Sequence, residues 1–418
     1  MRILQFVKTN YKHFLFINTL ALIVYAFFVA NSKSIYGTLF FTPDSKTYLQ
    51  VAQWILNGQK TGSLAVRPIF YPSIIAFCKW LFGHYDHYGI WLIQIIFYLG
   101  GINLAFISAY KLSKRIIVSY VTYFILLTNL SLMRYTMDAL TEITTFFLLS
   151  ILLYFSIVQM QRKDWLKLAM GNIFILSLLT ITKPVFYIPL LVFGVVTLLM
   201  FRKSIVKLPN LIYFFIALLP VIAQIWIMKK EFDTYKISRI GRITFTNYIF
   251  AQGLEKIKNL SREQAIEQAS KFSEKDKIYF VSKNYRTYIS LYLNNLVKNI
   301  AAEQGFRKKT KISYLFPVYM HFVNRLYLAF HVVFIFVFLF VQVYFFKKSR
   351  YLFYLSLGFY ALNVYYLAVT GISFGEGDRL VLPAIAIWSV FYPFWAYVLL
   401  SWKKESKDLF AQNYVQEF

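Results

Sequence analysis

The apolar stretch YKHFLFINTLALIVYAFFVAN, residues 11–31, is followed after a short connection by the polar stretch TPDSKTY, residues 42–48. The first has the length, about twenty residues, that a helix needs to cross a lipid bilayer. The second places Asp44 where that helix ends and water begins. A carboxylate at this depth is partly desolvated but still reachable, which suits it to take a proton from a substrate at the membrane surface.

The composition is that of a membrane protein. Hydrophobic residues make up 59% of the 418 residues and charged residues only 15%, and the mean hydropathy is +0.54. A soluble domain cannot hide so much apolar surface. The formal net charge is +27. Part of this positive charge is expected in the cytoplasmic loops, because Lys and Arg are enriched on that side of a membrane protein. The rest indicates contact with anionic lipid or a phosphate-bearing substrate. The sequence offers no soluble domain to bind nucleic acid.

Apolar runs of about twenty residues predict an all-α polytopic membrane protein with about ten transmembrane helices, since helices are the structure that carries such runs through lipid. The expected spans are 11–31, 88–110, 116–132, 141–160, 166–182, 185–201, 208–228, 322–345, 351–370 and 380–400.

Short basic loops predict the orientation. Segments 111–115, 161–167, 202–207 and 347–350 and both termini are basic, and counting spans puts all of them on one side. By the positive-inside rule that side is cytoplasmic. We therefore expect a multi-pass protein of the inner (plasma) membrane with both termini cytoplasmic and an extracytoplasmic active site. The outer segments are then 32–87, 133–140, the Lys183-Pro184 junction, 229–321 and 371–379.

Three parts are expected along the chain. Residues 1–228 form an N-terminal membrane module with the catalytic first outer loop 32–87, residues 229–321 an extracytoplasmic helical loop, and residues 322–418 the C-terminal membrane helices and a short cytoplasmic tail. The first outer loop is expected to hold a short amphipathic helix over 45–57 that Gly58 ends, and an interfacial or re-entrant helix over 70–83. The residues expected on one face of the first helix are Tyr48, Leu49, Ala52, Ile55 and Leu56.

The long outer loop is basic, with 18 Lys or Arg and 8 Asp or Glu between residues 229 and 311. It is expected to be helical from Ser261 to Ile300, and Ser261 with Gln264 fits a capping box. The basic surface is either a solvated helical face or a lid near an anionic headgroup or glycan.

Asp44 is the first candidate for catalysis. The alternative is that it only caps the helix over 45–57, because Asp is a favoured N-cap residue. The two roles are compatible.

Asp138 and Glu142 have the i, i+4 spacing that puts two side chains on one helical face, and that face would enter the span beginning near Thr141. Acids are costly there and are usually functional or paired. The alternative is an ion pair between Asp138 and Arg134. As functional residues, Asp138 and Glu142 would position an acceptor or bind a cation.

Basic residues end several spans on the outer side: Arg67, Arg134, Lys183 and Arg379. Each is long enough to reach the headgroups from a helix end. Gathered beside acids, they would also suit a lipid-linked phosphate leaving group, whose developing charge needs cationic donors. The run His84-Tyr85-Asp86-His87 lacks the spacing of a zinc site, so no metal ligands are predicted, although a requirement for a divalent cation stays open.

These motifs together resemble the bacterial GT-C membrane glycosyltransferases, the phospholipid-carrier-dependent group that includes protein O-mannosyltransferases and aminoarabinose transferases. The similar segments are 43–48, 67–72, 134–142, 180–184 and 379–383. Their order and their common side of the membrane carry the resemblance, which is weak in the long outer loop. One difference is that many members have Asp-Glu at the first motif, whereas here Asp44 is followed by Ser45.

The resemblance implies a polyprenyl-phosphate-linked sugar donor and an inverting, single-displacement transfer to a lipid, glycan or protein acceptor. Asp44 would be the general base that deprotonates the acceptor hydroxyl. Lys183, Arg67 and Arg379 would contact the departing phosphate, and Asp138 and Glu142 would line the same cavity. The full set of substrate-binding residues expected on this basis is Arg67, Tyr71, Arg134, Asp138, Glu142, Lys183 and Arg379.

Other functions remain open on the sequence alone. A transporter or flippase for polyprenyl-linked glycans would put ionisable groups at mid-membrane depth, whereas here they gather at one face. A polymerase or ligase of surface polysaccharide would fit the large late loop but would leave Asp44 without a role. A non-catalytic scaffold would tolerate replacement of the acids.

Overall fold

The computed structural model describes residues 10–32, 42–302, 305–306 and 309–401. Within these ranges the chain is helical and has no β-strand. The basic residues before Asn10 and after Ser401, on which part of the predicted orientation depends, lie outside the described residues. The predicted fold class, an all-α polytopic membrane protein, is confirmed.

Helices occupy all ten expected spans. In the described part of the chain, eight helical stretches are long and apolar enough to cross a membrane, and two shorter apolar helices, Ile116–Leu127 and Trp165–Thr180, occupy the other two expected positions. The ten helices are α2 (Tyr11–Asn31), α5 (Asp86–Ser113), α6 (Ile116–Leu127), α8 (Glu142–Gln161), α9 (Trp165–Thr180), α10 (Tyr187–Ile205), α11 (Leu208–Phe232), α17 (Leu315–Lys348), α18 (Arg350–Thr370) and α19 (Ile385–Ser401).

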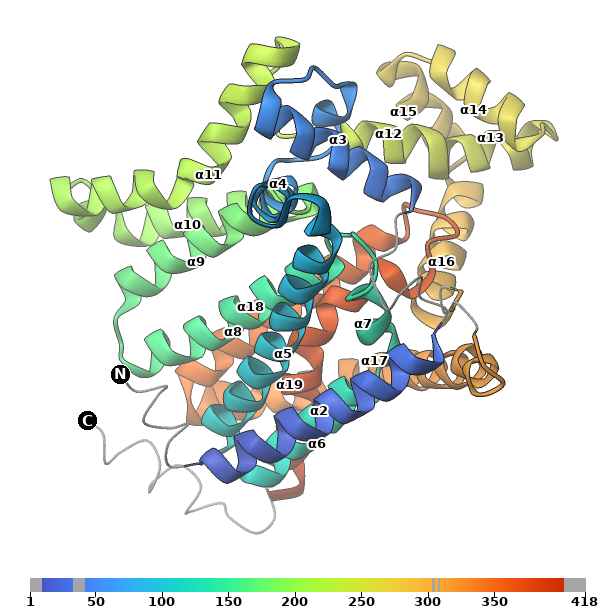
Figure 1. Cartoon of the computed structure of the whole chain (residues 1–418). Helices are drawn as coiled ribbons and strands as arrows, with labels where there is room; N and C mark the ends of the chain where they lie inside the picture. Colours follow the sequence, from blue (N-terminus) through green and yellow to red (C-terminus); the bar gives the residue numbers. More distant parts are fainter. Residues whose placement is uncertain (1–9, 33–41, 303–304, 307–308, 402–418) are drawn as a thin grey trace.

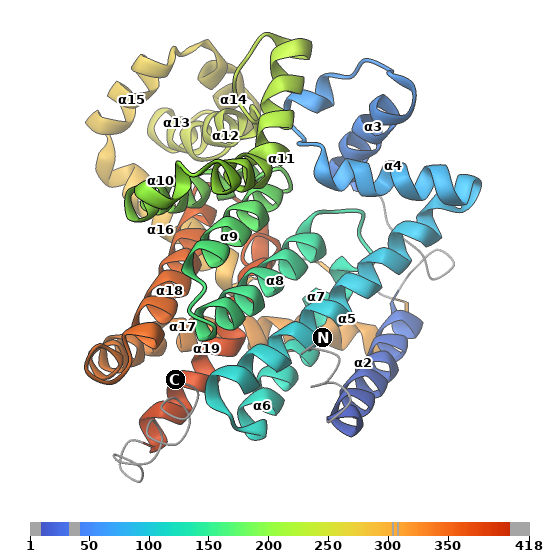
Figure 2. The same cartoon turned by 90° about the vertical axis from the view of Figure 1, so that its left-hand side faces the viewer.

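Helices α5, α8 and α19 form the centre of the bundle. Helix α5 packs against α6, α8 and α19, and α8 packs in addition against α9. Both views show this group surrounded by the other long helices (Figures 1 and 2). The core between them is apolar and aromatic, with Tyr98, Phe106, Phe146 and Trp395 almost fully buried. The centre of the bundle therefore consists of closely packed side chains.

The helix Pro43–Asn57 and the first helices of the long outer loop gather at one end of this bundle, at the top of both views (Figures 1 and 2). Those from the long outer loop have a small core of their own around Phe250, Leu254 and Tyr288. The shorter elements are α3 (Pro43–Asn57), α4 (Phe70–Phe82), α7 (Leu130–Tyr135), α12 (Ile240–Thr244), a π-helix (Phe245–Phe250), α13 (Ala251–Lys258), α14 (Arg262–Lys271), α15 (Glu274–Lys283), α16 (Tyr285–Ala301), and the 3-10 turns η1 (Gly62–Ala65), η2 (Gly83–Tyr85), η3 (Pro184–Phe186), η5 (Ile312–Tyr314), η6 (Gly377–Arg379) and η7 (Leu382–Ala384).

The helix expected over 45–57 is α3, but its cap differs from the prediction. Thr42 is the N-cap, and its hydroxyl accepts from the Ser45 N–H at 3.2 Å while the Ser45 hydroxyl accepts from the Thr42 N–H at 2.9 Å. Asp44 lies inside the first turn and is not the N-cap, so its carboxylate is left for other partners. Gly58 ends the helix in the left-handed region with φ of 71°, as expected.

The residues of α3 that are buried against the protein also differ in part from those expected. Tyr48 and Ala52 are buried as expected, but Ile55 and Leu56 are exposed. Ser45 and Val51 are buried instead. The last turn of α3 thus presents apolar side chains outward, which suits a helix that lies at a membrane surface.

Two expectations around residues 128–142 are wrong in detail. The span expected over 116–132 is divided, because α6 ends at Leu127 and Asn129 caps a new helix, α7, by accepting from the Leu132 N–H at 3.0 Å. Asp138 and Glu142 do not share a helical face, since α8 begins only at Glu142. The capping box of Ser261 and Gln264 is confirmed.

The packing of α5 on α8 gives a test of this fold. A methyl group on Gly101 would overlap the ring of Phe146, whereas a methyl group on Gly194 of α10 would meet no described heavy atom within 4 Å. Small residues at such contacts let helices approach closely. Gly101→Ala should lower the thermal unfolding temperature of the detergent-solubilised protein, and Gly194→Ala should leave it equal or higher because Ala is the better helix former. Equal effects of both changes would contradict this packing.

Candidate active site

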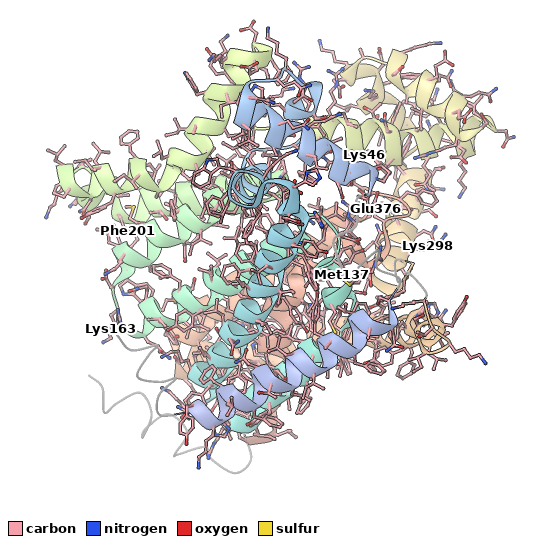
Figure 3. The ribbon with its side chains drawn as sticks, viewed as in Figure 1. Lys46, Met137, Lys163, Phe201, Lys298 and Glu376 are labelled. Carbon is pink, nitrogen blue, oxygen red and sulfur yellow. The ribbon has the colours of Figure 1, made fainter. Side chains whose placement is uncertain are left out.

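Five segments that are far apart in the sequence bring charged side chains to one end of the bundle. Asp44 comes from the first turn of α3, Arg67 follows η1, Glu142 opens α8, Lys183 precedes η3 and Arg379 ends η6. Figure 3 labels Glu376, a neighbour of Arg379, at this end, with Lys163 of the turn after α8 on the opposite side of the molecule. Their contacts bring these five side chains together at one end of the bundle.

Asp44 lies between two guanidinium groups. Its Oδ1 accepts from Arg67 Nη2 at 2.5 Å, and its Oδ2 accepts from Arg379 Nη2 at 2.7 Å. Arg67 is held in turn by Thr47, whose hydroxyl oxygen accepts from Nε at 2.9 Å, and its guanidinium lies 4.7 Å from the centre of the Tyr48 ring. Both partners of Arg67 come from α3, so this helix orients the base candidate and one of its cations together.

Arg379 joins Asp44 to a second carboxylate. Its Nε donates to Glu142 Oε1 at 3.0 Å and its Nη1 donates to Glu376 Oε2 at 3.1 Å. The same Glu142 oxygen accepts from Lys183 Nζ at 3.2 Å. Three cations and three carboxylates thus form one charge-balanced network, the condition under which charges tolerate burial.

The surroundings of Asp44 keep it ionised. Partial burial alone would raise its pKa, but the positive charges of Arg379 and Arg67 outweigh burial and hold the pKa of the carboxyl below its usual value of 3.8. The side chain is still 36% exposed, in contrast to 15% for Arg379. At neutral pH this site therefore holds a reachable carboxylate.

Glu142 is enclosed, with 1% of its side chain exposed. Its Oε1 accepts from Lys183 and Arg379, whereas its Oε2 is buried and accepts no hydrogen bond from a described residue. Buried carboxylate oxygens almost always have a hydrogen-bond donor. Oε2 can therefore accept a further hydrogen bond.

The remaining predicted residues lie in a second layer. Tyr71 is buried, donates to Gln94 Oε1 at 3.1 Å and packs edge-on against Tyr48 at 5.3 Å between ring centres. Arg134 and Asp138 form an ion pair with 3.5 Å between Nη2 and Oδ2, which confirms the ion pair considered as the alternative. Tyr71 therefore supports α3, and the Arg134–Asp138 pair belongs to the turn between α7 and α8.

Two acids of the segment that carries Arg379 were not predicted from the sequence: Glu376, which belongs to the network, and Asp378, which lies beside it. Glu376 accepts from Arg379 and also, at 3.5 Å, from the hydroxyl of Tyr248 in the π-helix. Asp378 is buried and accepts from Ser131 Oγ at 2.5 Å and from Asn324 Nδ2 at 3.2 Å. The sequence Glu376-Gly377-Asp378-Arg379 could have indicated both acids. They lie next to Arg379, a candidate phosphate ligand, and acids at the end of a membrane span need partners. No pattern in the outer loop marked Tyr248.

The helices of the long outer loop fasten the segment that carries Arg379. Asn299 of α16 donates to the carbonyl oxygens of Thr370 at 2.8 Å and Ser373 at 3.0 Å. Nearby, the Tyr292 hydroxyl donates to the Ala368 carbonyl at 2.6 Å. These bonds connect α16 to the end of α18 and to Ser373, at the start of the segment that carries Arg379, so the outer loop contributes to the position of the charged network.

The described residues contain no group of three or more His, Cys, Asp and Glu side chains arranged to hold a metal ion. His87 lies 3.6 Å from the carboxylate of Asp86 at the start of α5, away from the Asp44 network.

No protein-family model matches the sequence, and no curated protein matches it. Two solved structures are similar in fold. One is ArnT from Cupriavidus metallidurans bound to undecaprenyl phosphate, with a TM-score of 0.49 and 12% identity over 96% of this chain. The other is the same protein in the apo state, with a TM-score of 0.43 and 14% identity over 95% of this chain. This chain spans 62% of the length of each of those chains.

Removing the hydrogen bonds of Asn299 should make local opening of the segment 371–379 more frequent. Asn299→Leu removes the donor to two carbonyl oxygens, and buried carbonyl groups without a donor favour local opening. We expect faster hydrogen exchange at the amides of 371–379, measured by mass spectrometry. The control is Asn294→Leu, an exposed position on the same helix. Unchanged exchange in the Asn299 variant would show that α16 does not hold this segment.

Proposed function

We propose that the protein is an integral membrane glycosyltransferase. It moves a sugar from a polyprenyl-phosphate-linked donor to an acceptor hydroxyl at the outer face of the membrane. The transfer is inverting, in a single displacement: Asp44 takes the proton of the acceptor hydroxyl as the hydroxyl oxygen bonds to the sugar and the bond from the sugar to the phosphate breaks.

The observation that supports this most is the placement of Asp44. It is an ionised, partly exposed carboxylate between two guanidinium groups, at the end of a bundle of membrane-spanning helices. A general base must reach its substrate and be unprotonated at working pH. A lipid-linked substrate would bring both its phosphate and its sugar to this depth.

Three cations are suited to the phosphate. The guanidinium groups of Arg67 and Arg379 offer the planar pairs of N–H donors that phosphate binds well. Lys183 has three N–H bonds and directs one to Glu142. Because these groups are 13% to 15% exposed, water would weaken their attraction for a leaving phosphate less than at an open surface.

Binding of a phosphate would also change the base. Arg67 and Arg379 now lower the proton affinity of Asp44. A phosphate that takes part of their charge and hydrogen bonding would restore that affinity, because the pKa of a carboxyl depends on nearby positive charge. Asp44 would then become a stronger base only when donor is bound.

The other predicted residues would contact the sugar or the acceptor. Glu142 Oε2 and Arg134 Nη1 are buried atoms without a hydrogen-bond partner among the described residues, and hydroxyl groups of a sugar could supply both a donor and an acceptor. Asp138 would act through its ion pair with Arg134, and Tyr71 would act by holding Tyr48 and α3.

The sidedness is part of the same proposal. Basic turns such as 162–167 lie at the ends of α8 and α9 opposite to Glu142 and Lys183. By the positive-inside rule this supports an extracytoplasmic position of the Asp44 network in an inner membrane. We also propose three parts of the chain, residues 1–228, 229–321 and 322–418. The proposed acceptor is a lipid, a glycan or a protein, and no binding of nucleic acid is expected.

Asp44→Asn tests the proposal. Asn keeps the volume of the side chain, and Thr42 keeps the cap of α3, while the base is lost. With a pool of polyprenyl-phosphate sugars and membranes containing the protein, we expect the transfer rate to fall by about two to four orders of magnitude. A small carboxylate such as formate, added to the variant, should restore part of the rate.

The control is Asp233→Asn, which removes an exposed carboxylate that also pairs with a cation, Lys229. It should transfer at the wild-type rate.

The pH profile of the wild type adds a second check: since the pKa of Asp44 lies below 3.8, a loss of activity at acidic pH that is caused by protonation of Asp44 in the free enzyme must occur below that pH. Wild-type activity in Asp44→Asn would refute the base role and move the search to Asp138 and Glu142.

A further inference from the structure

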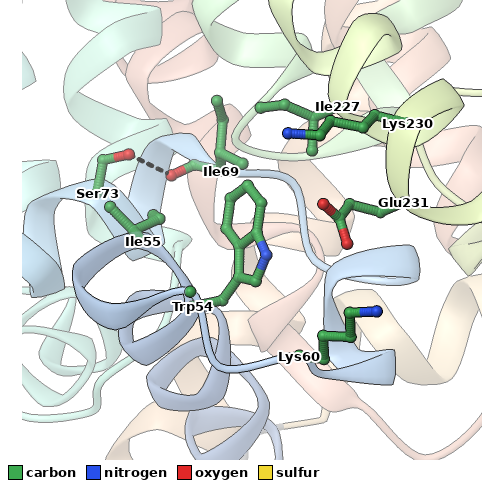
Figure 4. A pocket seen from close by; sticks show the side chains of 9 residues that line it. Trp54, Ile55, Lys60, Ile69, Ser73, Ile227, Lys230 and Glu231 are labelled. Atoms are coloured by element: carbon green, nitrogen blue, oxygen red, sulfur yellow. Dashed lines mark hydrogen bonds between the residues drawn. The ribbon is translucent and has the colours of Figure 1, made fainter.

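A cavity of about 580 Å³ lies at the C-terminal end of α3, whereas Asp44 is in the first turn of this helix. Its wall is formed by the last turns of α3, the start of α4 and the last turns of α11. Figure 4 shows the indole of Trp54 in the middle, with Ile69 and Ile227 on one side and Lys60, Lys230 and Glu231 around the rim. A second cavity of about 270 Å³ continues it past Thr61 and Phe232.

The cavity lies at the depth of lipid headgroups. Helix α11 is a membrane span that ends at Phe232, and its last two turns line the cavity. Exposed apolar side chains surround the opening: Ile55 and Leu56 of α3 and Trp226 of α11. Tryptophan is typical of the membrane interface, where its ring has an apolar body and a polar N–H. The apolar wall of the cavity thus continues into the surface that faces lipid.

The rim of the cavity is positive. Lys60 and Lys230 are exposed, and neither forms an ion pair with a described residue. Lys230 lies over the Trp226 ring, 5.5 Å from its centre. Glu231 is the one acidic residue of the lining. Two lysines against one glutamate leave a net positive rim above an apolar wall, which complements a phosphate attached to a hydrocarbon chain.

The wall is fixed by a buried side chain. Gln224 of α11 is fully buried, and its Oε1 accepts from the Ile69 N–H at 3.0 Å while its Nε2 donates to the Ile237 carbonyl at 3.1 Å. This amide joins α11 to the segment between Arg67 and α4. Ile69 faces the cavity, whereas Arg67, two residues earlier, faces Asp44. The cavity is therefore separate from the Asp44 network.

We propose that this cavity binds the phosphate headgroup and the upper part of one chain of an anionic phospholipid from the leaflet around the Asp44 end of the bundle. Lys60 and Lys230 contact the phosphate. Trp54, Ile69 and Ile227 contact the glycerol and the chain. Binding here does not depend on glycosyl transfer, so it can be measured without an active donor.

The test counts bound lipid on the full chain in detergent by native mass spectrometry, during titration with dioleoyl phosphatidylglycerol or dioleoyl phosphatidylcholine. The wild type should retain the anionic lipid in preference. Lys60→Ala with Lys230→Ala should weaken phosphatidylglycerol binding by about thirtyfold, since each lysine near a lipid surface contributes about fivefold. Ser73→Phe, which fills the cavity from α4, should reduce retention of the anionic lipid without changing any charge.

The matched control is Lys256→Ala with Lys275→Ala, two exposed lysines of α13 and α15. It removes the same charge from the outer helices and should bind phosphatidylglycerol as the wild type does. Glycerol phosphate without chains should not compete, because it lacks the apolar contact. The proposal is overturned if the Lys60 and Lys230 variant retains the lipid as the wild type does, if the control loses it equally, or if glycerol phosphate displaces it.

Discussion

The charged end of this protein depends on one side chain, Arg379, which contacts three carboxylates with its three nitrogens. It joins Asp44 of the first outer loop to Glu142 of α8, and so connects the N-terminal helices to a segment next to the last membrane helix. Without it, Glu142 would be a buried carboxylate neutralised by Lys183 alone. A buried charge that loses a partner is strongly destabilising, so the network constrains structure and chemistry together.

The helices of the outer loop also help to hold the charged network, in addition to the ends of the membrane helices. The segment that carries Arg379 receives hydrogen bonds from Asn299, and its acid Glu376 receives one from Tyr248. Tyr248 lies in a π-helix, a rare element that is often found at functional sites. The long outer loop between α11 and α17 thus supports Arg379 and Glu376, which are distant from it in sequence. Its role is therefore not limited to its positive charge.

Hydropathy and the basic turns were enough to predict the positions of the membrane helices, because backbone in lipid has few alternatives to a helix. Most residues of the network were predicted for a related reason: Asp44, Lys183 and Arg379 are charged residues that follow or interrupt apolar runs. Local details were missed where a side chain competes with the helix pattern, as when Asn129 starts a new helix after Leu127. Tyr248 and Glu376 could not be paired in advance, since their contact depends on tertiary packing.

The proposed function requires that this network bind a lipid-linked phosphate. The most direct measurement is the affinity of the purified protein for undecaprenyl phosphate, compared between wild type and Lys183→Gln, with Lys275→Gln as the surface control. Removing one buried charged donor should weaken binding by about tenfold or more, because hydrogen bonds to charged groups contribute about 1.5–3 kcal/mol. Equal affinity in wild type and Lys183→Gln, with both folded, would contradict the account.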